Sequence, residues 1–231
     1  MIIILRIGIV GAGRMGKALA GRLAKNFEVL LFDNKPDYLV RAAASLSVQA
    51  AAGIEEIAAA DAVILAVPDR EVTDCIKDFN GLKRVITVFN VATNVAHGTL
   101  TNMACPQVKC TSVKFVGHAL EIANGARPFI IINQQPAELV PLAQEIFSCI
   151  GEVMIGKADM VTVINTIAAE KVLEAAVRME DALKEQGFTQ PALIKSAIEQ
   201  VAAGIIRGYA NNNLGPFARE IEQAVKARQK R

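Results

Sequence analysis

A glycine-rich turn near the start of the chain constrains the fold more than any other feature. Arg6–Val10 is an apolar run, Gly11, Gly13 and Gly16 follow with the spacing G-x-G-x-x-G, and Val29–Asp33 is a second apolar run that ends in a carboxylate. The first glycine permits a tight turn, the second lets the backbone approach a pyrophosphate, and the third allows close helix–strand packing. Since a strand precedes the turn and a helix follows it, the motif predicts a dinucleotide-binding fold.

The helix after this turn and two later loops supply the other expected cofactor contacts. The first amides of a helix at Met15–Leu23 have no partner within the helix, so they are available to phosphates, aided by the helix dipole. Ala62–Val67 is an unbroken apolar run that Pro68 stops, as in a strand covered on both faces. Its end lies at the carboxyl edge of a parallel sheet, where dinucleotides bind. The expected cofactor contacts are Gly11, Ala12, Gly13, Arg14, Met15, Gly16, Asp33, Asn34, Ala66, Val67, Pro68, Val91 and Ala92.

Asp33 bears on which dinucleotide is bound. It follows the glycines by about twenty residues, at the tip of the second expected strand, where a carboxylate accepts hydrogen bonds from the adenosine ribose. A 2′-phosphate there would meet a like charge, so NAD(H) is favoured over NADP(H). Lys35 and Arg14 leave NADP(H) open because either could reach such a phosphate. Asp33 could also be a simple turn residue before Pro36.

The composition describes a globular protein without a nucleic-acid or membrane partner. The chain has 231 residues, of which 52% are hydrophobic and 21% charged, and its net charge of +2 is too small to favour nucleic acid. A solvated helix end explains the basic segment Lys226–Arg231. No apolar run approaches the roughly 20 residues that span a bilayer. Met1–Leu5 is expected to be part of the first strand and no signal peptide, which predicts a cytoplasmic protein.

The cysteines and histidines do not favour a metal site. Cys75, Cys105, Cys110 and Cys149 fit free thiols in a reducing compartment. Cys105 and Cys110 are close enough in sequence to be considered as a metal or redox pair. The chain has only two histidines, however, so a four-ligand zinc site is poorly supplied, and we expect no metal.

Apolar runs alternate with helical patterns through the first two-thirds of the chain. This alternation is typical of an α/β fold, a Rossmann-type, doubly wound and mostly parallel sheet. We expect strands at Ile2–Val10, Val29–Phe32, Leu46–Val48, Ala62–Ala66, Val85–Phe89, Val108–Val116, Phe129–Ile132 and Val153–Ile155. We expect helices at Met15–Lys25, Tyr38–Ala44, Ile54–Ala59, Glu71–Phe79 and Ala137–Cys149.

After Gly156 the strand patterns end and the chain becomes helical. Ala158–Gln186 is expected to be one long helix of roughly 40 Å, closed by Gly187 in a left-handed cap. A second helix starts near Pro191 and runs to about Asn211, and Gly215-Pro216 starts a third. We therefore divide the chain into a dinucleotide-binding domain, 1–157, and a helical substrate and dimerisation domain, 158–231. The second is too small to bury its own apolar faces, which predicts a homodimer.

On these elements the chain resembles the pyrroline-5-carboxylate reductase family, small NAD(P)-dependent reductases with an all-helical dimer domain. The resemblance rests on Ile9–Gly16, the strand Asp61–Val67, the strand ending in Val88–Ala92, and the entrance to the long helix at Met160–Ile164. It implies the same fold, a nicotinamide cofactor and a small-molecule substrate. In place of the family's methionine-proline-asparagine turn, this chain has Phe115–Ala119.

These features predict an NAD(P)-dependent oxidoreductase that transfers a hydride between nicotinamide and a small imine, amino acid, or hydroxy or oxo acid. The departures from the family fall on the substrate side, so the substrate and the reaction direction stay open. The alternative is a non-catalytic dinucleotide-binding regulatory or scaffolding protein.

A histidine and the polar face of the long helix are candidates for the chemistry. His118 follows an expected strand and could donate a proton to a carbonyl oxygen, although it could also be a surface or structural histidine. Thr162, Thr166 and Glu170 share one face of the long helix, with Asn165 beside them. We expect catalytic roles for His118, Thr166 and Glu170 and a substrate contact for Asn165. The other interpretation is that the hydroxyls bond back to their own helix and that the glutamate is solvated.

Overall fold

The protein is described here by a computed structural model that covers residues 4–103 and 105–229. It divides into two compact units, the first ending at Thr166 and the second beginning at Ile167. The functional division expected at residue 157 stays a prediction. Of the expected first strand and the basic carboxyl end, residues 2–3 and 230–231 lie outside the described residues.

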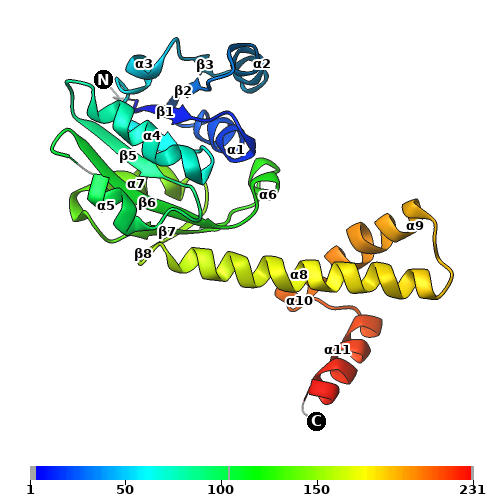
Figure 1. Ribbon diagram of the computed structural model, residues 1–231. Coiled ribbons are helices and arrows are strands. Elements are labelled where there is room, and N and C mark those ends of the chain that lie inside the picture. Colours follow the sequence, from blue (N-terminus) through cyan, green and yellow to red (C-terminus); the bar gives the residue numbers. More distant parts are fainter. Residues whose placement is uncertain (1–3, 104, 230–231) are drawn as a thin grey trace. The chain divides into compact units, whose positions relative to one another are not determined.

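The first unit is built on an eight-stranded sheet with the order β3-β2-β1-β4-β5-β6-β7-β8 (Figure 1). All neighbouring strands are parallel except β6 and β7, whose antiparallel register pairs Val113 with Ile132. The predicted doubly wound, mostly parallel sheet is therefore confirmed. The strands are β1 Arg6–Val10, β2 Glu28–Phe32, β3 Gln49–Ala50, β4 Ala62–Leu65, β5 Ile86–Asn90, β6 Val108–Val116, β7 Phe129–Asn133 and β8 Glu152–Gly156.

Helices cover both faces of this sheet, and each face has its own apolar core. The first core joins the sheet to α1 Arg14–Leu23, α2 Pro36–Leu46, α6 Ala119–Ala123 and α7 Val140–Ser148, the last preceded by the short η1 Ala137–Leu139. The second core joins it to α3 Ile54–Ile57, α4 Asp69–Asn80 and α5 His97–Met103. The central strands β1 and β4 are buried on both sides and are near-continuous apolar runs, as is typical of parallel strands covered by helices.

One arginine ties together segments that are far apart in sequence. Arg22, near the end of α1, donates to the carbonyls of Ile122 at 3.3 Å, Ala126 at 3.1 Å and Ile150 at 3.2 Å. Figure 1 shows α1 and α6 side by side, as these bonds require. The guanidinium thereby satisfies carbonyls around the end of α6 and before β8.

The structure corrects one local prediction and adds two helices. The strand expected at Leu46–Val48 is wrong, because α2 continues to Leu46 and ends at Ser47, whose φ of 54° is left-handed; β3 follows at Gln49. The helices α5 and α6 were not predicted. Both are short, seven and five residues, and α5 contains a glycine and two threonines, which have low helix propensity.

The helical part begins with α8 Met160–Glu185, whose first turns belong to the first unit and whose remainder belongs to the second. Gly187 follows with a φ of 85°, which confirms the predicted cap. Next come α9 Pro191–Ser196, a π-helical stretch η2 Ala197–Ala202, α10 Ala203–Ala210 and α11 Pro216–Gln229. None of the helices in the described ranges is long and apolar enough to cross a membrane.

Candidate active site

The three glycines of the turn differ in what holds them. Gly11 has a φ of 99°, and a Cβ there would stand 2.5 Å from the carbonyl oxygen of Ala66. A Cβ at Gly16 would collide with the carbonyl oxygen of Gly11. Gly13 has a φ of −65° and nothing within 4 Å of its Cβ position. The fold therefore needs Gly11 and Gly16, whereas Gly13 borders open space.

Asp33 and Tyr38 hold the turn in place. Ala12 N–H donates to Asp33 Oδ2 at 2.8 Å, and Lys35 N–H donates to Asp33 Oδ1 at 3.1 Å. The Tyr38 hydroxyl donates to Ala12 O at 3.0 Å. Asp33 is thus a turn residue in the structure, as one interpretation of the sequence held. Each carboxylate oxygen keeps a second lone pair, so this role leaves capacity for a ribose hydroxyl.

The start of α1 offers unpaired donors beside the turn. Its first backbone bond of the helical type runs from Lys17 N to Gly13 O at 3.0 Å. The amides of Arg14, Met15 and Gly16 precede it and have no acceptor four residues back within the helix. Together with the dipole of a ten-residue helix, they make this end suited to an anion.

A cleft of about 940 Å³ lies next to these groups. Seven of the expected cofactor contacts line it: Gly11, Gly13, Asp33, Asn34, Ala66, Val67 and Pro68. The other lining residues are Val10, Phe32, Lys35, Tyr38, Arg41, Ile54, Glu71, Asp74, Cys75 and Asp78. The remaining expected contacts, Ala12, Arg14, Met15, Gly16, Val91 and Ala92, are not among its lining residues. Val91 is nonetheless joined to the end of β4 through Leu65 O at 3.1 Å.

The cleft wall formed by α4 carries negative charge. Glu71, Asp74, Cys75 and Asp78 lie on one helix face, at spacings of three and four residues. Burial, followed by the charges of Asp78, Glu71 and Asp74, raises the pKa of the Cys75 thiol to about 11. Lys35 and Arg41 supply positive charge from the side of α2.

The first turns of α8 are bonded to the carboxyl edge of the sheet. The Thr162 hydroxyl donates to Thr93 O, after β5, at 2.6 Å, and Asn165 Nδ2 donates to Phe115 O, near the end of β6, at 2.9 Å. Thr162 and Asn165 therefore both lie at the edge where the cleft opens. The amide of Asn165 is used by the backbone in this arrangement.

The three expected catalytic residues make no such contacts. His118 is exposed and precedes α6 without a side-chain capping bond. Thr166 is exposed at the end of the first unit, and Glu170 is exposed on α8 in the second unit. Their catalytic roles stay predictions.

A polar cluster around the buried Lys114, near the same edge, was not predicted from the sequence. The Lys114 side chain on β6 is only 1% exposed, and its ammonium lies 2.7 Å from Asp159 Oδ1. The backbone N–H of His97 donates to both carboxylate oxygens of Asp159 at 3.1 Å. In the ring of the same residue, Nδ1 lies 3.4 Å from the Ser112 hydroxyl oxygen. The available signal was that Lys114 lies between Val113 and Phe115 in an expected strand, because a buried lysine requires a partner.

The electrostatics of this cluster follow from burial and pairing. Burial by itself would raise the pKa of Asp159, but hydrogen bonds from Lys114 and His97 N–H, with the Lys114 charge, hold it below its usual value. Burial lowers the pKa of His97. Asn90 on β5 is fully buried beside Ser112, and its Oδ1 accepts from Ala92 N–H at 3.2 Å.

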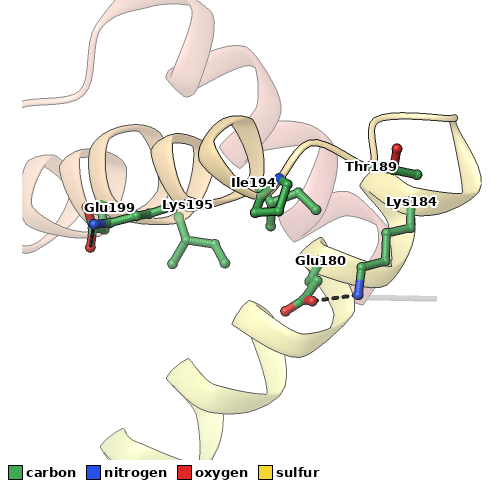
Figure 2. Close-up of a pocket in the computed structure, with 8 residues that line it drawn as sticks. Glu180, Lys184, Thr189, Ile194, Lys195 and Glu199 are labelled. Carbon is green, nitrogen blue, oxygen red and sulfur yellow. Dashed lines mark hydrogen bonds and ion pairs between the residues drawn. The ribbon is translucent and has the colours of Figure 1, made fainter.

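Within the described ranges, no group of three or more histidine, cysteine, aspartate or glutamate side chains could hold a metal ion. A smaller hollow of about 450 Å³ lies in the second unit, between the end of α8 and α9 (Figure 2). Its charges are matched, since Lys184 pairs with Glu180 at 2.6 Å and Lys195 with Glu199 at 3.8 Å. This hollow therefore offers no net charge to a charged ligand.

Residues 6–91 match the model of a family described as NADP oxidoreductase, coenzyme F420-dependent. This span holds the glycine turn, Asp33 and the strands β1, β2, β4 and β5. None of the curated proteins matches the chain.

Solved structures share the fold over most of the chain. A pyrroline-5-carboxylate reductase from Coxiella burnetii superposes with a TM-score of 0.68 at 14% identity, covering 96% of this chain and 85% of its own. A 3-hydroxyisobutyrate dehydrogenase from Salmonella typhimurium superposes with a TM-score of 0.68 at 19% identity, covering 92% of this chain and 80% of its own. A reductive aminase from Aspergillus terreus, in complex with NADPH4, cyclohexanone and allyl amine, gives 0.66 at 16% identity over 96% and 78%. The predicted resemblance to the pyrroline-5-carboxylate reductases is confirmed in the fold.

Proposed function

We propose that the protein is an NAD(P)-dependent oxidoreductase that transfers a hydride between nicotinamide and a small imine, amino acid, or hydroxy or oxo acid. The observation that carries this proposal is the open space at Gly13. The turn contains a glycine that its own packing does not require, next to unpaired helix amides and a large cleft. A bound pyrophosphate would explain the glycine, because the ligand needs the space that a side chain at residue 13 would fill.

We propose one orientation for the cofactor along this edge. The pyrophosphate is placed at the amides of α1, the adenosine ribose at Asp33, and the nicotinamide near Ala66–Pro68 and Val91–Ala92. NAD(H) is the proposed cofactor because Asp33 and the α4 carboxylates disfavour a further phosphate. NADP(H) is the alternative, since Lys35 and Arg41 line the same cleft. The structural relatives are consistent with either, because their described complexes contain NAD⁺ or NADP.

When bound, the nicotinamide supplies the hydride, and the protein supplies orientation and any proton. An iminium ion arrives charged and needs little acid catalysis, whereas a ketone needs a donor near its oxygen. We propose His118, Thr166 and Glu170 as the catalytic groups and Asn165 as a substrate contact. The bond from the Thr162 hydroxyl to Thr93 O, after β5, supports a substrate site beside this edge, because it holds the first turn of α8 there.

A non-catalytic dinucleotide-binding regulator is the second candidate. Two observations favour it: the Asn165 amide is bonded to Phe115 O, and His118 is exposed without a capping bond. Turnover separates the two candidates. We expect a panel of cyclic imines and of 2-oxo and 2-hydroxy acids to give substrate-dependent change at the nicotinamide absorbance. NADH binding without turnover of any panel member would favour the regulator.

A chemical probe tests where the dinucleotide lies. Cys75 lines the cleft, so bound NADH should slow its alkylation, measured by peptide mass spectrometry at pH 8.5. Cys149, which is half-buried and hydrogen-bonded to Ile146 O at 2.8 Å, is the internal control. If NADH slowed the alkylation of neither thiol, or slowed both equally, the assignment of this cleft would be contradicted.

We also propose a homodimer formed through the helices of the second unit, in the cytoplasm. Large apolar side chains are exposed over this unit, among them Ile167, Val172, Leu173, Val177, Ile206 and Phe217. Such a density of exposed apolar side chains is typical of a protein–protein interface. The four free cysteines suit a reducing compartment.

A further inference from the structure

The peptide groups on either side of Ala12 are each held by a side chain from outside the turn. Asp33 accepts from Ala12 N–H at 2.8 Å, and the Tyr38 hydroxyl donates to Ala12 O at 3.0 Å. Ala12 is itself fully buried. Two successive peptides in the middle of the turn therefore have fixed orientations before any ligand arrives.

The bond from Tyr38 gives the Ala12 carbonyl a partner outside α1. In a regular helix, Gly16 N–H would donate to the carbonyl four residues earlier, which is that of Ala12. The structure instead begins this pattern one residue later, from Lys17 N to Gly13 O. With its carbonyl bonded to Tyr38, Ala12 does not extend the helix backward. The Gly16 amide thereby stays among the unpaired donors.

The same bond also orients Gly13. A trans peptide is planar, so the Ala12 carbonyl and the Gly13 N–H point in opposite directions. Because the carbonyl is directed to Tyr38 on α2, the Gly13 N–H is directed away from Tyr38. Gly13 lines the cleft and borders open space.

We propose that Tyr38 is a positioning residue for the dinucleotide: its hydroxyl fixes the Ala12 carbonyl so that the amides of Gly13 and the first turn of α1 stay arranged for a pyrophosphate. This inference rests on the proposed function, since it requires a dinucleotide in the cleft. The Tyr38 ring has separate contacts, because it lines the cleft and carries the Lys17 ammonium 5.4 Å from its centroid. Tyr38→Phe removes the hydroxyl and keeps the ring.

The test compares ligands that have and lack a pyrophosphate. Wild type and Tyr38→Phe are titrated with NADH, ADP-ribose and adenosine, by fluorescence for the first and by calorimetry for the others. We expect affinity for NADH and ADP-ribose to fall about 3- to 10-fold, the range of one neutral hydrogen bond. Adenosine has no phosphate, so its affinity should stay unchanged. A general structural defect would weaken all three ligands alike.

Tyr209→Phe is the matched control. Tyr209 is the other of the two tyrosines, and it also has a lysine over its ring, Lys226 at 5.8 Å. This variant should bind all three ligands as the wild type does. Wild-type affinity of Tyr38→Phe for NADH and ADP-ribose, or an equal loss for adenosine, would overturn the positioning role. Wild type that binds neither NADH nor NADPH would instead overturn the proposed function, and this inference with it.

Discussion

At the scale of single residues, the glycine turn separates what folding needs from what a ligand needs. Gly11 and Gly16 are enclosed by backbone, so any side chain there disturbs the turn itself. Gly13 has an ordinary φ and open space, so a side chain there disturbs only what enters that space. Substitution at Gly13 is therefore a clean probe of binding.

Gly13→Val should abolish dinucleotide binding while the protein stays folded, because the new side chain occupies the space that the pyrophosphate needs. Gly204→Val on α10 is the control, since Gly204 also has nothing within 4 Å of its Cβ position. NADH titration and circular dichroism of both variants make the measurement. A folded Gly13→Val protein with unchanged NADH affinity would refute the cofactor site.

Asp33 has two roles to separate, because it accepts bonds from the turn and is also proposed to bind the adenosine ribose. Asp33→Asn keeps an oxygen for Ala12 N–H and removes the charge, so we expect weaker NADH binding and a raised NADPH-to-NADH affinity ratio, by about tenfold. Asp33→Ala should also raise this ratio, but it should lower the affinity for both NADH and NADPH further, since Ala12 N–H loses its acceptor. Wild type that binds NADPH more tightly than NADH at equal ionic strength would contradict this role.

At the scale of elements, Asp159 joins three parts of the first unit. Its carboxylate accepts from the backbone N–H of His97, at the start of α5, and pairs with Lys114 on β6. The residue itself directly precedes α8. Thr162 and Asn165 continue this attachment along α8. The cluster therefore fixes the first turns of α8 to the sheet edge where the substrate is proposed to bind.

Removing the Asp159 charge should destabilise the first unit by about 1–3 kcal/mol at pH 7. This is less than the cost for a fully buried pair, because Asp159 is half-exposed and solvent screens it. Its pKa is lowered in the folded state, so its contribution is full above the unfolded value near 4 and is lost as pH falls through the lower folded value.

Urea unfolding of Asp159→Asn and wild type between pH 3 and 7 measures this effect. The difference between the two proteins should be constant at neutral pH and shrink below about pH 4. Asp181→Asn, at an exposed position on α8, is the control and should show little difference. A difference between Asp159→Asn and wild type that persists undiminished at pH 3 would argue against the ion pair.

The sequence predicted the sheet and the cofactor turn because their signals are local. An apolar run, a glycine spacing and a terminal carboxylate lie within about 30 residues, the length of one βαβ unit. The Lys114–Asp159 pair could not be predicted in this way, since its members are 45 residues apart. Tyr38 was missed for a similar reason: only the fold brings α2 to the Ala12 carbonyl.

At the scale of the whole molecule, the exposed apolar side chains of the second unit bear on assembly. We expect sedimentation at micromolar concentration to give the mass of a dimer, twice 24.7 kDa. Charged substitution of Val172 and Leu173, both exposed on α8, should shift the protein to monomer because apolar contact no longer drives association. Arg178→Glu on the same helix is the control. A monomer at all concentrations for the wild type would rule out the dimer.

The three carbonyls held by Arg22 also have a dynamic meaning. A single guanidinium closes α6 and the turn before β8 onto α1, so these segments should open together in native-state hydrogen exchange. Segments a hundred or more residues apart in sequence then behave as one cooperative unit. The Gly125 amide donates to Ile122 O, and the Gly151 amide, in the same peptide group as Ile150 O, donates to Phe147 O. Both amides would report that shared opening as equal exchange free energies.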